Sequence, residues 1–403
     1  MTLIGSGGRV IGSAGGVFSF GGGAIAAPTS FVLAQQGGAS NNTSPVSNSN
    51  AFSWISSGAP FYRIYRRTRT SSFSDNAWGS VYATVSSSTA ASNFTTLSGN
   101  TQGLQAITFL SGTDSAYTDT VATSNNIVDL SSAPTVYQYA ITAYDGSNES
   151  AMVYPDCILY AGETNTGSIG NGYGSSTTNP TDTTGSPVPG PHDVKVVFSS
   201  AGGGWLPYLT PPICQGANGF PNDLEIGGFN YWQIDVKVTD TQYLTNPLNF
   251  GITTRIPPGD AFSWTTHNLW NYCTPSVNNW VTARIAITAL TKGITTFSGR
   301  IVGTGTGTGT LTATVTAPNF VDNSAYITGP GVPAGTYTNG IISITDGNGS
   351  GTYTVNGPGL TGSTDTGTVT MTYQCTGFYK SGFQPGTDTN MTVFFNNWKL
   401  TTL

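Results

Sequence analysis

The chain has 403 residues, of which 53 are glycine and only 8% are Asp, Glu, Lys or Arg, with a net charge of −6. Ordinary soluble proteins carry about 25% charged residues, and coiled coils need more, so this composition excludes a long-helix protein. The 11% aromatic content argues against a disordered chain, and the acidic balance argues against nucleic-acid binding. Short apolar runs between Gly, Ser, Thr and Asn predict an all-β protein of about two to four domains.

The first segment, residues 1–26, is glycine-rich and carries a single charge, Arg9. It has too little apolar surface to fold alone, so we expect it to anchor the chain on another subunit of an assembly; packing on its own chain is the alternative. It lacks the basic start and continuous apolar run of a secretion signal. No apolar stretch of the sequence reaches the ~18 residues of a membrane span, so we expect no membrane insertion.

Residues 27–162 contain alternating apolar and polar runs that predict short strands, and the run ending at Tyr144 is followed by an Asp-Gly turn. Four motifs in this region resemble a fibronectin type III domain: Trp54, YRIYRR at 62–67, YTDT at 117–120 and VYQYAITAYDGSNESA at 136–151. The resemblance implies a β-sandwich with Trp54 in its core and Tyr137 as the tyrosine-corner residue.

Residues 163–191 are mostly Gly, Ser, Thr, Asn and Pro, a composition typical of a linker. From residue 192 to 403 the predicted strands are longer. Residues 231–240 alternate strictly, with Trp232 and three aliphatic residues on one face and polar residues on the other. One face of this strand should therefore lie in a core, and the other should meet solvent or a ligand.

A Gly/Thr-rich stretch at about 299–373 interrupts the second region, and we interpret it as an inserted small β module. Its segments GPGVPAGTY at 329–337 and GSGTYTVN at 349–356 resemble a module that recurs in bacteriophage virion proteins such as tail fibres. The resemblance implies a virion component that is made in the host cytoplasm and displayed on the particle surface.

Without this module, residues 192–403 resemble a jelly-roll carbohydrate-binding module. The likeness rests on NDLEIGGFNYWQIDVKVTD at 222–240, SVNNWVTARIAITAL at 276–290 and GFYKSGFQPGTDTNMTVFFNNWKL at 377–400. It implies a jelly-roll sandwich that contacts sugars. Many such modules hold Ca²⁺, and here Asp223, Asp240 or Asn397 would be its ligands. Apart from Ca²⁺, we expect no cofactor.

The candidate glycan site lies in AFSWTTHNLWNYC at 261–273, which gathers aromatic and amide side chains. We select six residues: Trp264, His267, Asn268, Trp270, Asn271 and Tyr272. Aromatic faces stack on the C–H faces of sugar rings, and amides bond sugar hydroxyls. The competing explanation is that these aromatics fill the core or contact a neighbouring subunit, which is the usual reason for large aromatics.

We therefore predict a non-enzymatic phage surface protein, a head decoration or tail-associated component. It would bind other virion proteins through residues 1–26, form a homo-oligomer or multicopy array, and adhere to host-surface polysaccharide by avidity. One alternative is a polysaccharide depolymerase or glycoside hydrolase, which needs a carboxylate pair such as Asp223 and Glu225. The other is a structural capsid cement without a ligand.

The four cysteines, at 157, 214, 273 and 375, have no metal-binding spacing. A cross-link between two of the last three, and buried free thiols, are both compatible with the sequence.

Overall fold

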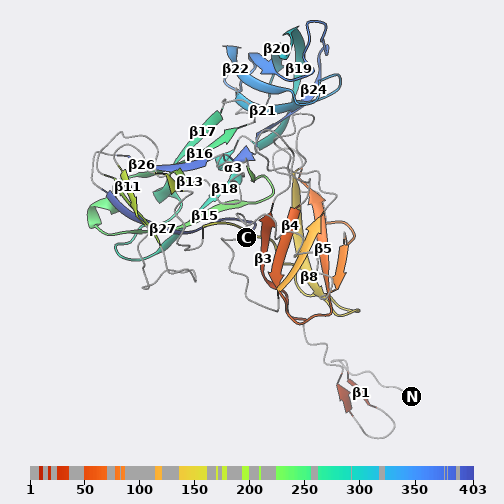
Figure 1. The fold of residues 1–403 in the computed structure, drawn as a ribbon, viewed down its shortest axis with the longest axis vertical. Coiled ribbons are helices and arrows are strands. Elements are labelled where there is room, and N and C mark those ends of the chain that lie inside the picture. The colour runs from red at the N-terminus through yellow and green to blue at the C-terminus, as the bar shows by residue number, and fades with distance from the viewer. Residues whose placement is uncertain are drawn as a thin grey trace.

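A computed structural model gives the fold of this 403-residue chain. The structure describes residues 9–11, 17–19, 25–35, 50–69, 78–81, 83–86, 114–119, 136–160, 169–170, 175–178, 193–198, 208–209, 224–255, 262–291, 293–316, 323–375, 377–378, 380–386 and 391–403. The predicted all-β class is confirmed, because antiparallel sheets and one closed barrel make up nearly all of the regular structure in these ranges (Figure 1).

The N-terminal sandwich consists of two three-stranded sheets. The first has the order β3 (Thr29–Gln35), β4 (Asn50–Ile55), β7 (Asp114–Asp119), and the second has the order β6 (Ala83–Ser86), β5 (Phe61–Thr68), β8 (Tyr137–Tyr144). A separate pair, β1 (Arg9–Ile11) with β2 (Val17–Ser19), lies within the predicted anchor segment.

Aromatic side chains fill the space between these two sheets. Trp54 is buried as predicted, and its ring lies 5.2 Å from that of Tyr62 on the opposite sheet. Phe52 contacts Tyr139 in the same way, with ring centroids 4.5 Å apart. The ring of Tyr137, predicted from the resemblance to be a tyrosine corner, lies 4.4 Å beneath the guanidinium of Arg66.

The C-terminal sandwich also has two sheets. One has the order β10 (Ile169–Gly170), β13 (Tyr208–Leu209), β26 (Lys380–Pro385), β16 (Leu248–Arg255), β17 (Phe262–Asn268). The other has the order β11 (Ser175–Thr178), β12 (Val194–Phe198), β27 (Met391–Thr401), β15 (Tyr231–Val238), β18 (Val281–Ala286). Strands β10 and β11 lie inside residues 163–191, so part of the segment that we interpret as a linker extends both sheets.

Shorter elements complete this sandwich: the strand pair β14 (Leu224–Glu225) with β25 (Gly377–Phe378), the 3-10 turns η3 (Thr241–Leu244) and η4 (Leu269–Asn271), and the helix α3 (Ile287–Leu290). The predicted apolar face of β15 is buried, with Trp232 fully enclosed between the sheets. Its ring lies 5.4 Å from that of Phe250 on β16, so the alternation read from the sequence places this strand correctly.

The two sandwiches are joined directly. Strand β9 (Cys157–Tyr160) follows the N-terminal sandwich and pairs with β27 of the C-terminal one. The ammonium of Lys399 on β27 lies 2.6 Å from the carboxylate of Asp156. Buried Arg69 donates to the carbonyl of Phe229 at 3.0 Å. One continuous apolar cluster contains residues of both sandwiches, so they form a single packed body.

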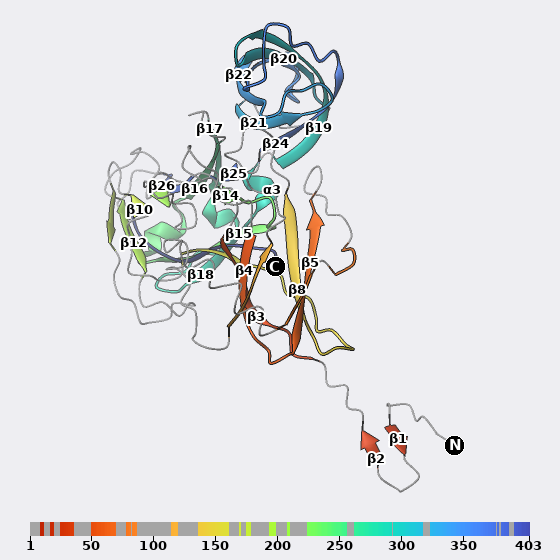
Figure 2. The same ribbon diagram turned by 45° about the vertical axis from the view of Figure 1, so that its right-hand side comes forward.

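Between α3 and β25 the chain forms a closed barrel, which Figure 2 shows nearly end-on. Its strands, in order around the barrel, are β19 (Gly293–Gly305), β20 (Thr308–Thr314), β23 (Gly351–Asn356), β22 (Tyr337–Ile344), β21 (Asn323–Thr328) and β24 (Val369–Cys375). The barrel has its own apolar cluster, which shares no residue with that of the sandwiches. Strand β19 pairs with β24 from Gly293–Cys375 onward, so boundaries at 299 and 373 would cut both strands.

These contacts predict that the barrel can be removed at its true boundaries. Gly293 and Cys375 are paired across the ladder, and antiparallel partners lie about 5 Å apart, which a short turn can span. We expect that replacing residues 293–375 with a short Gly-Ser turn leaves the sandwiches folded, with little change in Tm. The matched deletion of 299–373 leaves Phe297 without its partner strand and should lower Tm. Unfolding of the first variant would show that the barrel supports the sandwich core.

Candidate functional site

The candidate glycan site forms a structured corner where β17 ends. The Asn268 side chain accepts a hydrogen bond from the backbone N–H of Trp270 at 3.1 Å, which caps the single turn of η4. Leu269 anchors this turn in the sandwich core. The backbone of Trp264 pairs with Thr253 on β16, whereas its side chain lies outside the described residues.

The imidazole of His267 is held at both nitrogens. Nε2 lies 3.0 Å from the carbonyl oxygen of Ala289, which can only accept, so Nε2 carries the proton. Nδ1 then accepts from the Tyr272 hydroxyl at 2.9 Å. Burial lowers the pKa of His267 below its usual 6.5, and the bond to Ala289 offsets this only in part, so the ring is neutral at pH 7. Both ring nitrogens of His267 are therefore engaged in hydrogen bonds within this corner.

Trp270 combines packing with a partly exposed ring. Its indole N–H donates to the carbonyl of Asn246 at 2.6 Å, and the ring packs on the edge of the core. Cys273 is partly buried nearby, and burial raises the pKa of its thiol to about 11. Asn271 at the tip of the turn is exposed. The structure thus brings Trp270, Asn271 and the His267–Tyr272 pair together at one corner. The side chains of Trp270, His267 and Tyr272 also make hydrogen bonds that hold the fold at this corner.

The expectation that the polar face of β15 meets solvent or a ligand is wrong, because Gln233, Asp235 and Lys237 on that face are all buried. The ammonium of Lys237 lies 4.8 Å from the ring centroids of both Trp280 and Phe394, which belong to neighbouring segments of the sheet. The alternation at 231–240 predicts that Lys237 faces outward. It gives no information on Trp280 and Phe394, because their approach depends on pairing with β18 and β27.

Asp235 lies further along the same face and is nearly fully buried. Its two carboxylate oxygens accept from Thr282 at 2.5 Å and from Asn397 at 2.8 Å. Burial raises the pKa of Asp235 despite these hydrogen bonds, which act to lower it. These donors fix the carboxylate in the sheet and explain why an acidic residue is tolerated at this depth.

The predicted calcium ligands have other partners. Asp240 caps the 3-10 turn η3 by accepting from the backbone N–H of Gln242 at 3.0 Å, whereas Asn397 donates to Asp235 in the middle of β15. Asp223 lies outside the described residues. Within the described ranges, no group of three His, Cys, Asp or Glu side chains could hold a metal ion. Among the described residues, Asp240 and Asn397 therefore do not form the expected Ca²⁺ site.

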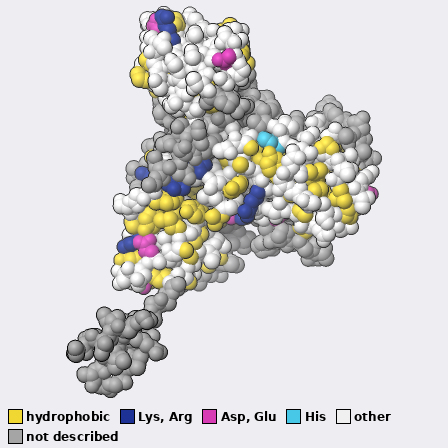
Figure 3. Space-filling model, turned by 180° about the vertical axis from the view of Figure 1, so that it is seen from behind, with side chains coloured by type: hydrophobic (Ala, Val, Ile, Leu, Met, Phe, Trp, Pro, Cys, Tyr) yellow, Lys and Arg dark blue, Asp and Glu magenta, His cyan; other side chains and the backbone are white. Residues whose placement is uncertain are grey.

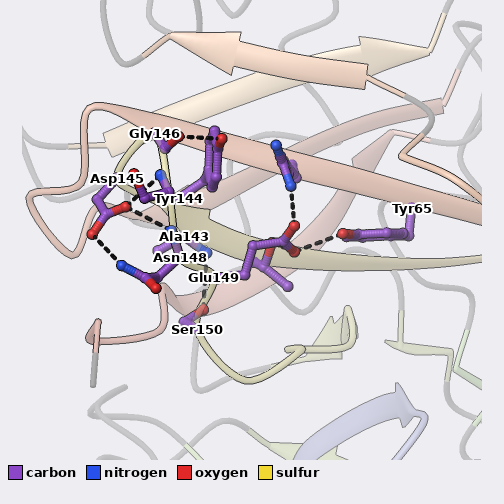
Figure 4. A network of polar contacts seen from close by, with 11 residues as sticks. Tyr65, Ala143, Tyr144, Asp145, Gly146, Asn148, Glu149 and Ser150 are labelled. Carbon is purple, nitrogen blue, oxygen red and sulfur yellow. Dashed lines mark hydrogen bonds and ion pairs between the residues drawn. The ribbon is translucent and has the colours of Figure 1, made fainter. Parts of the chain in front are cut away.

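The N-terminal sandwich carries a polar network around Glu149, shown in Figure 4. The Glu149 carboxylate accepts from the Tyr65 hydroxyl at 2.6 Å and from Thr142 at 2.9 Å, and it forms an ion pair with Arg63. Burial raises the pKa of Glu149, but the hydrogen bonds from Tyr65, Arg63 and Thr142 outweigh it and the pKa is lowered. The network ties the chain after the 145–148 turn to β5 and β8, which is a structural role.

The cysteine alternatives are resolved for three positions. Cys157, Cys273 and Cys375 are free thiols, and Cys214 lies outside the described residues. In the part of the chain that the structure describes, no helix has the length and apolar character needed to cross a bilayer.

Comparisons with known proteins find no matching family model and no matching curated protein. One solved structure is similar, SGBP-B from a complex xyloglucan utilization locus in Bacteroides uniformis, with a TM-score of 0.26 and 12% identity over 98% of this chain and 78% of that chain. The expected identity as a bacteriophage virion surface protein is wrong, since no family model, of phage proteins or of any others, matches this chain. The glycines of those segments have structural reasons in the barrel: Gly331, Gly335 and Gly349 have positive φ, and a Cβ at Gly351 would lie 2.1 Å from the carbonyl oxygen of Ser343.

Proposed function

We propose that this protein binds glycans without cleaving them, and that the corner formed by residues 267–272 of the C-terminal sandwich is the binding site. The observation that carries the proposal is the pairing of a partly exposed indole, held by its N–H to Asn246, with the exposed amide of Asn271. A sugar ring can stack on the first and hydrogen-bond to the second.

The charge of the segment favours a neutral polysaccharide. Residues 261–279 contain no Asp, Glu, Lys or Arg, so the corner offers neither an ion partner for an acidic sugar nor a carboxylate for hydrolysis. His267 engages both ring nitrogens within the fold, which disfavours a role as general base. Because the ring of Trp270 is already held in place, little side-chain entropy is lost when a ligand stacks on it.

The remaining domains support this role as a scaffold. The strand orders β3-β4-β7 and β6-β5-β8, with residues near 149–153 bridging the free edge of β8, favour a fibronectin type III-like spacer. The two five-strand paths of the C-terminal sandwich favour a jelly-roll-like module. When several copies bind one polymer at the same time, the avidity exceeds the weak affinity of a single site.

The experiment is affinity electrophoresis of the full chain in native gels containing neutral polysaccharides: a mixed-linkage β-glucan, a galactomannan and an arabinoxylan. We expect retardation by at least one. Asn271→Ala should weaken it about fivefold, the effect of losing roughly 1 kcal/mol of hydrogen bonding, and Trp270→Ala should weaken it at least as much. Thermal melts should show that Asn271→Ala leaves the fold intact.

The matched control is Trp280→Ala, which removes an indole from the opposite sheet, beside Lys237. It should leave retardation unchanged. If Trp280→Ala abolishes retardation while Asn271→Ala and Trp270→Ala do not, the outer face of β15 is the binding surface instead. If none of the polysaccharides retards the wild-type chain, the proposal fails.

A further inference from the structure

The outer face of the sheet β6-β5-β8 in the N-terminal sandwich carries two pairs of aromatic side chains. At one end Phe61, which is 37% exposed, lies beside Tyr144, with ring centroids 6.3 Å apart. At the other end Trp78 lies beside Tyr154, with centroids 6.0 Å apart, and both rings are partly exposed. Figure 3 shows hydrophobic side chains gathered on this sandwich. Aromatic rings that stay exposed in groups mark an interaction surface.

The strand register places both pairs on one face. Tyr62 of β5 belongs to the buried core, so Phe61 and every second residue after it, as far as Arg67, point to the opposite face. Arg67 lies opposite Gln138 of β8, and its guanidinium lies 4.1 Å from the ring centroid of Trp78. Phe61 and Arg67 are six residues apart on an extended strand, which separates the two aromatic pairs by roughly 20 Å.

An arginine holds one ring of each pair. The guanidinium of Arg63 lies 3.5 Å from the ring centroid of Tyr144, as that of Arg67 does at 4.1 Å from Trp78. Arg63 is itself fixed by its ion pair with Glu149, and Arg67 donates to the side-chain oxygen of Gln138 at 2.8 Å. Cation–π contacts stabilise the orientation of the rings. A ligand that stacks on them therefore costs little side-chain entropy.

The centre of this face is polar. The network of Glu149, shown in Figure 4, lies between the two aromatic pairs, and the side chains of Glu149 and Arg63 are each 25% exposed. Their opposite charges cancel, so the centre offers hydrogen-bond donors and acceptors without net charge. Protein–protein interfaces have the reverse arrangement, an apolar centre within a polar rim. Aromatic rings on either side of an electrically neutral polar centre suit a neutral sugar chain, which has both C–H faces and hydroxyls.

We propose that this face, formed by Phe61, Tyr144, Trp78 and Tyr154 around the Glu149 network, is a second binding site for neutral polysaccharide. The inference rests on the proposed function of the corner at 267–272, and it makes the N-terminal sandwich a binding domain as well as a spacer. The two sandwiches form one packed body, so the two sites keep a fixed separation. A polymer that reaches both sites gains affinity through the high effective concentration of the second contact.

The test is affinity electrophoresis of the full chain in the same polysaccharide gels. Trp78→Ala removes a stacking ring and should weaken retardation about fivefold. Phe61→Ala, at the other end of the face, should weaken it as well. Trp78→Ala combined with Trp270→Ala should weaken retardation more than either change alone. The matched control is Tyr231→Ala, which removes an exposed aromatic ring from the C-terminal sandwich and should leave retardation unchanged. Thermal melts should show that each variant keeps its fold.

The outcomes separate this inference from the function proposed for the corner. If Trp270→Ala weakens retardation while Trp78→Ala and Phe61→Ala match wild type, the second site does not exist and the corner stands. If Trp78→Ala and Phe61→Ala weaken retardation while Trp270→Ala does not, the outer face of β6-β5-β8 is confirmed and the corner fails. If Tyr231→Ala weakens retardation as much as Trp78→Ala, the losses are not specific to this face and the inference is overturned.

Discussion

Replacing Trp398 with alanine should lower the free energy of unfolding of the sandwich body by about 3–5 kcal/mol, the range for a buried Trp. Its ring is fully buried, stacked on Phe395 at 5.5 Å and tilted against Phe383 at 5.6 Å. It belongs to the part of β27 that pairs with β9 on one side and β15 on the other, so the cavity would open where these three strands meet.

Chemical denaturation followed by tryptophan fluorescence measures this loss. The matched control is Phe394→Ala on the same strand, which removes a partly exposed ring from the outer face and should cost roughly 1 kcal/mol. A Trp398→Ala loss no larger than that of the control would mean that the ring stack around Trp398 contributes little to the core.

Gly303→Ala should destabilise the barrel by about 3 kcal/mol or more, because a Cβ at this position would lie 1.7 Å from the carbonyl oxygen of Thr361. The obstacle is backbone and cannot rotate away. The Gly303 N–H also donates to the carbonyl of Thr364 at 2.8 Å, so any shift that makes room breaks a hydrogen bond. The segment near 361–367 lies along β19 and would have to move outward.

Gly305→Ala is the control, since its Cβ would meet only the Thr308 hydroxyl at 3.7 Å, an ordinary contact. Amide exchange across the barrel strands should accelerate strongly in the Gly303 variant and hardly in the Gly305 variant, while the sandwich strands stay protected. Equal exchange in both variants would contradict the steric argument.

Some of the fold follows from local patterns, and some depends on distant partners. Alternation correctly identifies the apolar core face of β15, but it also predicts an accessible opposite face, and that face is buried too because its polar side chains find partners in the neighbouring strands. The barrel boundaries are not readable in this way. Residues 293–298 hold only two large apolar side chains, Ile294 and Phe297, and only their pairing with β24, about eighty residues later, assigns them to the barrel. The strands β10 and β11 lie in polar sequence whose role is set by the sheets that they extend.

The candidate site shows the same division. Composition correctly gathers Trp270, Asn271 and Tyr272 at one corner, because they follow one another on a single turn. The fixed tautomer of His267 depends on Ala289, which is brought near by α3, and the indole of Trp270 depends on Asn246. Those partners have no local sequence signal, so which aromatics are held in place could not be predicted.

The pairing of β9 with β27 has a mechanical consequence. A polymer that pulls on the C-terminal sandwich while the N-terminal segment is tethered would load the β9–β27 ladder, because that ladder is among the contacts that join the two sandwiches, together with the Asp156–Lys399 ion pair and the hydrogen bond from Arg69 to Phe229. Backbone hydrogen bonds of a ladder share such tension, whereas a flexible tether would simply extend. The barrel, whose two ends are neighbours on paired strands, lies outside this line of force. Tension should therefore pass from one sandwich to the other while the barrel stays unstrained.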